Sequence, residues 1–368
     1  MKVIFLMRVD AVSKRGGDTV QILNYIKELE KKGIEAVLST DLSIDITDFD
    51  IIHLVNIDRP LETYHFFQKA KRLRKKIVLS PIHHSYSQIA IYENTERTGF
   101  LKLLNYIAKD YWGREKIKNI FRGLYNRDLF RLAFNQLFRD LYKMQKEIIE
   151  KSDGIALIAK GEKNLIESEF DTSIMTYEVI PNGVKFNSKN TSENISSIKN
   201  VYDVLVVGRI EARKNQLNII KALKDTDLKV GFVGSENKYH KNYVEIFKKE
   251  LTLCENMEYL GEVPHEEMGR LYKSSKIHLS ASWFEVSPLV DLEALYYGCK
   301  IVTSKNSFSE EYLQSRALYT SPGNQIEIRE TILKALNDNS NVSHRDFINQ
   351  NFNWESSINK LIDLYNNI

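Results

Sequence analysis

Short apolar runs rich in β-branched residues recur along the whole chain and alternate with segments of helical periodicity. In the first half the expected strands are residues 2–7, 35–38, 51–55, 77–80, 154–158 and 176–180. In the second half they are residues 203–207, 228–233, 257–260, 277–280, 300–303 and 317–320. Because parallel strands need a long crossover connection, usually a helix, this alternation predicts an α/β protein with two doubly wound parallel sheets.

The two halves are separated by residues 187–200, which are rich in Asn, Ser and Lys and lack apolar periodicity. We therefore expect a first domain at residues 1–185, a second at 186–350 and a closing helix at 351–368. The expected helix is amphipathic, and the residues on its apolar face are Trp354, Ile358, Leu361 and Tyr365.

The composition is that of an ordinary globular protein with room for two cores: 368 residues, of which 43% are hydrophobic and 27% are charged. A formal net charge of +3 is too small to imply nucleic acid. Two cysteines, Cys254 and Cys299, are too few for a disulfide framework or a metal site, which favours a reducing compartment. No apolar run approaches the length of a signal segment or a membrane span, so we expect a cytosolic protein.

Two carboxylates, Glu285 and Glu293, are separated by seven residues across an expected strand-to-helix turn. Ser287 is the expected N-cap of the helix, Pro288 lies in its first turn, and Gly298 ends it. A helix N-terminus attracts an anion, and a carboxylate accepts hydrogen bonds from sugar hydroxyls. The segment therefore has the groups needed to hold a nucleotide sugar. The spacing alone fits equally well with two surface glutamates beside an ordinary βα turn.

This segment, residues 280–304, resembles the Glu-x7-Glu signature of the family 4 retaining glycosyltransferases. Five further stretches resemble motifs of that family, in the family's order: Arg15-Gly16-Gly17, Ile180-Pro181-Asn182-Gly183-Val184, Val207-Gly208-Arg209-Ile210-Glu211-Ala212-Arg213-Lys214-Asn215, Val233-Gly234-Ser235-Glu236 and Tyr259-Leu260-Gly261-Glu262-Val263-Pro264. The resemblance covers nearly the whole chain except residues 86–151. It implies the GT-B fold, in which an acceptor-binding and a nucleotide-sugar-binding Rossmann-like domain face a central cleft and the closing helix packs back on the first domain.

The same resemblance implies roles for individual residues. Arg209 and Lys214 would bind the diphosphate of the donor, since two cations stabilise the charge of the leaving group without a metal. Glu293 would accept hydrogen bonds from the ribose, and Glu285 would approach the sugar or the phosphate end. The expected catalytic residues are Glu285, His83, Arg209 and Lys214, with His83 favoured over the adjacent His84. The expected substrate-binding residues are Gly16, Gly17, Asn182, Gly208, Gly234, Val263, Ser287, Leu289 and Glu293.

Each of these residues also has a structural interpretation. A single Arg or Lys is commonly a solvated surface cation, and Gly16 and Gly17 fit a plain tight turn. Arg213 is expected to face away if Lys214 faces the donor. The histidines outside the 83–84 pair are expected to be structural: His53, His65, His240, His265, His278 and His344.

The chain departs from the family at Val286, Ser287 and Pro288, where the family has glycines whose amides contact the sugar. Proline has no amide hydrogen, so the contacts to the sugar must differ, and the donor cannot be named from the resemblance. Two Asp-x-Asp triplets, at 48–50 and 225–227, suggest a manganese-dependent transferase of another fold. Both triplets precede their expected strands, at the sheet edge opposite to the ligand edge, so we expect neither a metal nor a cofactor.

The stretch from 86 to 151 is an insertion without a counterpart in the family. Between residues 100 and 146 it contains eleven Lys or Arg, four acidic residues and ten aromatic residues. Cations and aromatics at helical spacing predict an element that lies on a membrane surface. They also fit a helical insertion with its aromatics inside and its cations in water. Single-stranded nucleic acid suits such a composition too, but no recognition motif accompanies it, so we expect no nucleic-acid partner.

Together these features predict a metal-independent retaining glycosyltransferase. Its donor would be a nucleotide diphosphate sugar, and its acceptor a glycan or lipid-linked saccharide in bacterial surface polysaccharide synthesis, of which lipopolysaccharide is one kind. We expect it in the cytoplasm, peripheral at the inner face of the cell membrane. A sugar-nucleotide epimerase of related fold is one alternative. A catalytically silent nucleotide-sugar-binding scaffold is another, against which the intact Arg209, Lys214, Glu285 and Glu293 argue.

Overall fold

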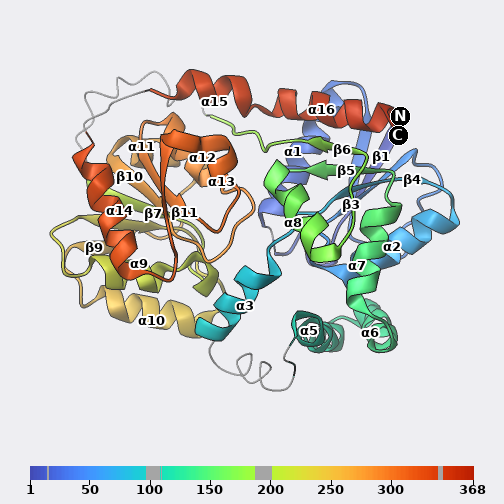
Figure 1. Ribbon diagram of the computed structural model, residues 1–368, viewed down its shortest axis with the longest axis horizontal. Coiled ribbons are helices and arrows are strands. Elements are labelled where there is room, and N and C mark those ends of the chain that lie inside the picture. The colour runs from blue at the N-terminus through green and yellow to red at the C-terminus, as the bar shows by residue number, and fades with distance from the viewer. Residues whose placement is uncertain (15, 97–107, 109, 187–200, 339–342) are drawn as a thin grey trace. The chain divides into compact units, whose positions relative to one another are not determined.

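The computed structural model describes residues 1–368 except 15, 97–107, 109, 187–200 and 339–342 (Figure 1). The described residues divide into two compact units. Unit 1 draws on residues 1–94, 98–183 and 354–368, and unit 2 on residues 95–97 and 184–353. The chain passes from one unit to the other between Gly183 and Val184, inside the motif that the family resemblance identifies as the junction. Arg15 and the expected linker at 187–200 lie outside the described residues.

Unit 1 contains six parallel strands in the order β2-β1-β3-β4-β5-β6. These strands are β1 (Lys2–Leu6), β2 (Glu35–Ser39), β3 (Ile51–Val55), β4 (Lys76–Ser80), β5 (Gly154–Leu157) and β6 (Tyr177–Val179). The central strands β3 and β5 are buried along their whole length, as expected for parallel strands that are covered on both faces.

The helices of unit 1 pack on this sheet or on one another. They are α1 (Gly17–Lys31), α2 (Pro60–Arg72), α3 (Tyr86–Thr95), α5 (Tyr111–Tyr125), α6 (Arg127–Asn135), the 3-10 helix η1 (Gln136–Phe138), α7 (Leu141–Lys151), α8 (Lys160–Phe170) and α16 (Trp354–Asn366).

The closing helix α16 packs on unit 1, against α1, β5 and β6 (Figure 1). All four residues of its expected apolar face are buried: Trp354, Ile358, Leu361 and Tyr365. The Tyr365 hydroxyl lies 2.6 Å from Nδ1 of His53, a fully buried residue of β3. Burial lowers the pKa of His53 to about 3, so this imidazole is neutral and serves as a structural link. The expected amphipathic helix and the structural interpretation of His53 are thus confirmed.

Unit 2 repeats the scheme with six parallel strands in the order β12-β11-β10-β7-β8-β9. These strands are β7 (Tyr202–Val207), β8 (Val230–Val233), β9 (Met257–Tyr259), β10 (Ser275–Ser280), β11 (Lys300–Ser304) and β12 (Ala317–Thr320). All twelve expected strands are therefore present, with ends that differ from the expected ones by at most two residues.

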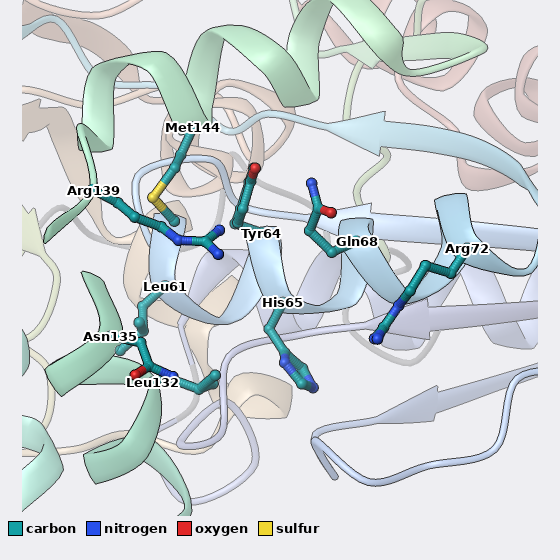
Figure 2. A pocket seen from close by; sticks show the side chains of 9 residues that line it. All are labelled: Leu61, Tyr64, His65, Gln68, Arg72, Leu132, Asn135, Arg139 and Met144. Atoms are coloured by element: carbon teal, nitrogen blue, oxygen red, sulfur yellow. The ribbon is translucent and has the colours of Figure 1, made fainter.

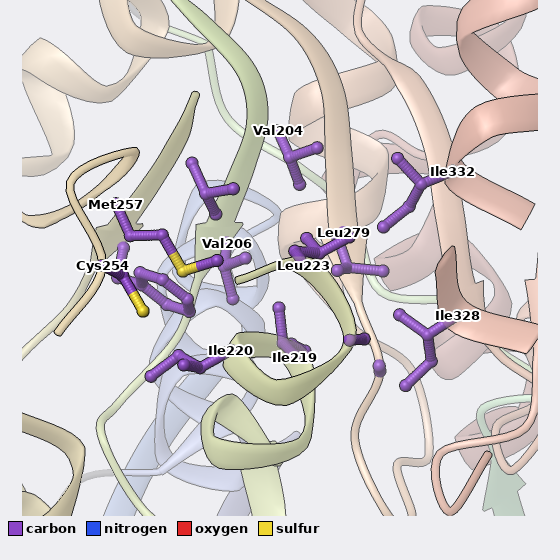
Figure 3. Close-up of a cluster of buried hydrophobic side chains, with 14 of the residues drawn as sticks. Val204, Val206, Ile219, Ile220, Leu223, Cys254, Met257, Leu279, Ile328 and Ile332 are labelled. Carbon is purple, nitrogen blue, oxygen red and sulfur yellow. The ribbon is translucent and has the colours of Figure 1, made fainter. Parts of the chain in front are cut away.

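The helices of unit 2 follow most of its strands. They are the 3-10 helix η4 (Ala212–Lys214), α9 (Gln216–Leu223), α10 (Lys241–Leu251), α11 (His265–Lys273), α12 (Leu289–Tyr296), α13 (Ser309–Leu313), the 3-10 helix η5 (Gln314–Arg316), α14 (Gln325–Asn337) and α15 (Arg345–Asn351). One core lies between the sheet and helices α9, α10 and α14, where aliphatic side chains from β7, β10, α9 and α14 meet (Figure 3). Close packing in this core keeps the sheet rigid, and with it the loops that follow the carboxyl ends of the strands.

The aromatic residues of the insertion are divided between interior and surface. Trp112 donates a hydrogen bond to Gln145 (Nε1–Oε1 2.9 Å) and packs edge-on against Tyr142, so these two partly buried rings pack within unit 1. Phe121, Phe130, Phe134 and Phe138 are exposed instead. Tyr106 and the side chain of Tyr125 lie outside the described residues. In the part of the chain that the structure describes, no helix is both long enough and apolar enough to cross a bilayer.

Candidate functional site

In unit 2 the strand order reverses at β7, which has β8 on one side and β10 on the other. Ligands of open parallel sheets bind beyond the carboxyl ends of the strands, at such a reversal. The loop after β7 contains Arg209 and Lys214, and the loop after β10 contains Glu285. The topology thus brings residues about seventy positions apart in the sequence to one edge of one sheet.

Backbone turns made of glycine line this edge. Gly208 follows β7 and Gly234 follows β8, with φ angles of 156° and 146°. The Gly208 amide donates to Val233 O (2.9 Å), and the Gly234 amide donates to Gly261 O (2.8 Å). A Cβ atom on Gly234 would lie 2.2 Å from Gly208 O, so only glycine allows this approach. The turns therefore lie against one another at the edge where a ligand would bind.

The turn after Gly208 is held by Asn215, which has a left-handed conformation (φ 66°) at the start of α9. Its side-chain amide donates to Ala281 O (2.9 Å) and Pro322 O (2.7 Å). The stem of Lys214 passes over Gly208, since a Cβ atom there would lie 3.4 Å from Lys214 Cδ. The Lys-Asn pair of the motif therefore has two tasks: Asn215 fixes the turn, and Lys214 is presented from it.

A cluster of five charged side chains occupies this edge: Arg209, Glu211, Arg213, Lys214 and Glu285. Glu285 Oε1 receives both Arg213 Nη1 at 2.6 Å and Lys214 Nζ at 2.5 Å. Glu211 is buried and contacts Arg213 (3.2 Å) and Arg209 (3.5 Å). Burial would raise the pKa of Glu211, but these cations outweigh burial and lower it, so Glu211 is charged. Three cations against two carboxylates leave the cluster with an excess positive charge.

The expectation that Arg213 faces away from Lys214 is wrong, because both side chains bind the same carboxylate oxygen. Successive residues converge here because they lie at the end of the short 3-10 helix η4, and the loop after β10 comes to meet them. Trp283 N donates to Arg213 O (2.9 Å), which fixes the two loops together. A sequence gives no sign of such a contact between loops that are far apart in the chain.

Glu293 lies on α12, away from these ion pairs, and is mostly buried. Its Oε1 atom lies 3.1 Å from His265 Nε2, and its Oε2 atom accepts from the Tyr272 hydroxyl at 3.3 Å. The hydrogen bond to Glu293 raises the pKa of His265 above its usual value. His265 is exposed on its other side and begins α11 directly after the Val263-Pro264 motif. It was expected to be structural; its contact with Glu293, which is expected to bind the ribose, makes it a candidate residue of the site as well.

Helix α12 begins at Leu289, one residue after Pro288, which is the N-cap. The sequence predicted Ser287 as the N-cap, and this prediction is wrong. The Ser287 hydroxyl lies 3.4 Å from Tyr312 Oη instead. The expected end of the helix at Gly298 is confirmed, because Gly298 has φ 98° and the Cys299 amide donates to Ala294 O (3.0 Å). The side chains of Leu289 and Val263 are partly buried and pack against the core of unit 2. A donor would therefore contact these two residues through their backbone or through the exposed part of their side chains.

In unit 1 the His83 side chain is fully buried, and both of its ring nitrogens have carboxylate partners. Nδ1 lies 2.6 Å from Asp58 Oδ1, and Nε2 lies 2.8 Å from Glu169 Oε2. Burial alone would lower the pKa of His83, but Asp58 and Glu169 outweigh it and raise the pKa to about 10. This geometry does not fit the expected donor-facing role of His83. His84, which contacts Asp58 through Nδ1 (2.9 Å), is the partly exposed member of the pair.

The remaining expected residues of unit 1 occupy the loop after β1 and the junction. Gly16 is the N-cap of α1 and Gly17 its first residue. A side chain on Gly16 would meet the Asp18 carboxylate at 2.8 Å, whereas Gly17 borders open space. Asn182 is buried, and among the described residues its Oδ1 atom has no hydrogen-bond partner. A buried amide oxygen without a partner is costly in the free protein, so Asn182 stays a candidate for ligand contact.

Comparison with known proteins gives a family match over part of the chain. Residues 188–354 match the family model described as glycosyl transferases group 1. A curated protein of Methanocaldococcus jannaschii, described as an uncharacterized glycosyltransferase, is 27% identical over 229 residues. That match covers 58% of this chain and 58% of the relative, so it spans less than two thirds of the relative's length.

Three solved structures are similar over nearly the whole chain. Sucrose-phosphate synthase from Thermosynechococcus elongatus has a TM-score of 0.73 at 13% identity and covers 100% of this chain and 98% of its own. Anabaena HepE in complex with UDP has a TM-score of 0.66 at 14% identity and covers 100% of both chains. The lipopolysaccharide outer core galactosyltransferase WaaB, in its apo form, has a TM-score of 0.62 at 15% identity and covers 99% of both. The expected GT-B fold is thereby confirmed.

Proposed function

We propose that this protein, whose residues 188–354 match the group 1 glycosyltransferase model and whose fold is GT-B, transfers a sugar with retention from a nucleotide diphosphate sugar. The observation that carries the proposal is the positive cluster at the strand reversal of unit 2. There Arg209 and Lys214 lie beside the glycine turns, and Glu293 lies on the neighbouring helix α12. This arrangement supplies cations for a diphosphate and a carboxylate for a ribose at one sheet edge.

The first test of the proposal is a thermal-shift panel with UDP-, GDP-, ADP- and CMP-sugars. A ligand that binds only the folded protein stabilises it by about 2.7 kcal/mol at a concentration of 100 times its Kd. We expect one nucleotide class to raise the unfolding temperature and the others to leave it unchanged. If no nucleotide sugar or nucleoside diphosphate shifted the transition, the proposed function would be wrong. Turnover of the selected donor without any acceptor would favour an epimerase instead.

The contact between Glu293 and His265 predicts how pH affects nucleoside binding. A ribose that binds Glu293 must compete with the His265 hydrogen bond, and this bond favours the protonated imidazole. The raised pKa of His265 therefore falls on binding, binding releases a proton, and affinity increases as pH rises through that pKa. Calorimetry with the bare nucleoside avoids the ionisation of the phosphates. We expect tighter binding at pH 8 than at pH 6, and no such difference in His265→Ala.

Glu293→Ala should weaken nucleoside binding at either pH by about 10- to 100-fold, because a hydrogen bond to a charged group contributes about 1.5–3 kcal/mol. The matched control is Glu310→Ala, which removes an exposed carboxylate from α13 in the same unit. If Glu293→Ala bound the nucleoside as tightly as the wild type, α12 would not contact the ribose.

We also propose that the acceptor is a glycan or lipid-linked saccharide of a surface polysaccharide, and that the insertion rests on a membrane at the cytoplasmic face. The support is an apolar surface formed by exposed residues of α5, α6 and η1: Phe121, Leu124, Phe130, Phe134, Leu137 and Phe138. Phe138 is the most exposed of these, at 83%. So many exposed apolar side chains on neighbouring helices are unusual for a protein surface that meets only water.

A pocket adjoins this apolar surface and provides cations next to it. It has a volume of about 270 Å³ and lies between α2, α6 and α7, with Arg139 and Arg72 among its lining residues (Figure 2). Asn135 and Arg139 of the pocket directly follow the exposed Phe134 and Phe138 in the chain. The Arg139 guanidinium lies 5.6 Å from the centre of the Tyr64 ring. Cations beside exposed aromatics suit the boundary between lipid headgroups and acyl chains.

Not all cations of the insertion are available for lipid. Lys118 contacts Glu93 (3.1 Å) and Glu115 (3.3 Å), and Arg122 contacts Glu115 (3.1 Å). Both carboxylates are buried, so replacing these cations would weaken the pairing of buried charges and destabilise unit 1. The cations suited to a membrane test are therefore the exposed ones, such as Arg131 and Arg139. Those at 100–107 and 109, and the side chain of Arg127, lie outside the described residues.

The membrane proposal predicts that the wild type co-sediments with anionic vesicles at low salt and that the triple variant Phe134→Ser, Leu137→Ser and Phe138→Ser does not. Its matched control changes three exposed apolar residues of unit 2 to serine: Tyr239, Leu253 and Ile326. Transfer to a soluble acceptor analogue should survive in both variants. Wild-type protein that stayed in the supernatant with anionic lipid in excess would exclude the membrane surface.

A further inference from the structure

Arg213 is the one cation of the charged cluster to which the glycosyltransferase motif assigns no role. Its guanidinium donates to Glu285 Oε1 (2.6 Å), to Phe284 O (3.3 Å) and to Glu211 Oε1 (3.2 Å). Its own carbonyl oxygen accepts from the Trp283 amide. Arg213 is therefore bound to the loop after β10 by side chain and backbone at once, and its position depends on no ligand.

Lys214 depends on the same oxygen. Its ammonium group lies 2.5 Å from Glu285 Oε1, the atom that also receives Arg213. A diphosphate that takes Lys214 as its ligand must draw this ammonium group away from Glu285. Withdrawing a cation from a mostly buried carboxylate is costly unless another charged group stays bound to it. With Arg213 in place, Glu285 retains a short, charge-assisted hydrogen bond when Lys214 leaves.

We propose that Arg213 is a positioning residue that holds Glu285 and thereby releases Lys214 to the diphosphate of the donor. The inference rests on the proposed function, since it takes Lys214 as a ligand of the diphosphate. It assigns the two neighbouring cations different tasks: Arg213 neutralises Glu285 permanently, and Lys214 alternates between Glu285 and the phosphates. Arg213 contacts neither substrate nor reacting atoms.

The test compares Arg213→Gln, Glu285→Gln and the double variant by calorimetry with the nucleoside diphosphate that the panel selects. In Arg213→Gln, Glu285 loses its ion pair with Arg213 and holds Lys214 more tightly, so we expect affinity to fall at least 10-fold. In Glu285→Gln no carboxylate competes for Lys214, so the nucleoside diphosphate should bind at least as tightly as to the wild type. The double variant should return to within about threefold of wild-type affinity. Sugar transfer should stay low in the double variant, because Glu285 is absent.

The outcomes separate this inference from its alternatives. If Arg213 bound the diphosphate itself, or only stabilised the loops, the added Glu285→Gln change would not restore affinity, and the inference would be wrong. Unchanged affinity in Arg213→Gln would also overturn it. Should Arg213→Gln fail to fold, Glu285→Gln alone decides, since weaker binding by that variant contradicts competition for Lys214. Failure of the wild type to bind any nucleoside diphosphate would instead defeat the proposed function.

Discussion

Replacing Lys214 with methionine should lower sugar transfer by about 100- to 1,000-fold, the range found when one preorganised group that stabilises developing transition-state charge is removed. The leaving nucleoside diphosphate gains negative charge as its bond to the sugar breaks, and the Lys214 ammonium group is positioned to neutralise it at the edge of the sheet. Methionine retains an unbranched apolar stem, which keeps the cover over Gly208 that Lys214 provides. The loss can then be attributed to the charge rather than to a hole beside the glycine turn.

The matched control for this variant is Lys221→Ala, which removes an exposed lysine from α9, the helix that Asn215 begins. It should transfer sugar at the wild-type rate. Arg209→Ala should act in the same direction as Lys214→Met, since its guanidinium is partly exposed beside Glu211 and is the second cation expected on the diphosphate. Wild-type turnover in Lys214→Met, measured as initial rate against donor concentration, would remove Lys214 from the reaction.

The same charge argument predicts that transfer survives exhaustive treatment with EDTA, because the protein's own cations stabilise the leaving group. A strict requirement for added manganese would contradict it and would direct attention to the triplets at 48–50 and 225–227. The triplet at 48–50 directly precedes β3, and the triplet at 225–227 ends two residues before β8 begins, so both lie at the edge of their sheet away from the carboxyl ends of the strands.

The fold could be predicted from the sequence because it depends on local patterns. The strands of the two sheets are short runs rich in β-branched and other apolar residues, and most crossovers contain a helix, so period and spacing define the alternation. The end of α12 could also be predicted, since only glycine adopts the φ of 98° found at Gly298 without strain. The face of α16 followed from helical spacing, which places Trp354, Ile358, Leu361 and Tyr365 on one side.

The contacts of the site could be predicted only in part, because they join loops that are distant in sequence. The family resemblance predicted that Lys214 and Glu285 belong to one site, but not the hydrogen bond between them, nor the third partner Arg213. The burial of His83 could not be predicted, because proximity to a strand end does not determine which of two adjacent imidazoles turns inward. The deciding groups, Asp58 and Glu169, lie 25 and 86 residues away. No local sequence pattern indicates that Asp58 and Glu169 lie beside His83.

Gly234→Ala should have the largest effect on the architecture of the site. The new Cβ atom would lie 2.2 Å from Gly208 O and 3.1 Å from Arg209 N, both of them backbone atoms that no rotamer change can move. The left-handed φ of 146° adds strain for any residue with a side chain. We expect the free energy of unfolding to fall by about 3 kcal/mol or more, since overpacking against a fixed backbone costs about 1–3 kcal/mol before the strain is added. Chemical denaturation measures this loss.

Gly261→Ala separates the collision from the strain. Gly261 belongs to the same row of turns and has a positive φ of 76°, but a Cβ atom there would meet nothing within 4 Å. Its cost should be only the left-handed conformation, about 1–2 kcal/mol. Nucleotide binding should be retained in Gly261→Ala and lost in Gly234→Ala, because displacing Gly208 and Arg209 moves the backbone that presents the cations. Equal losses of stability in the two variants would mean that the turns after β7 and β8 do not lie in contact.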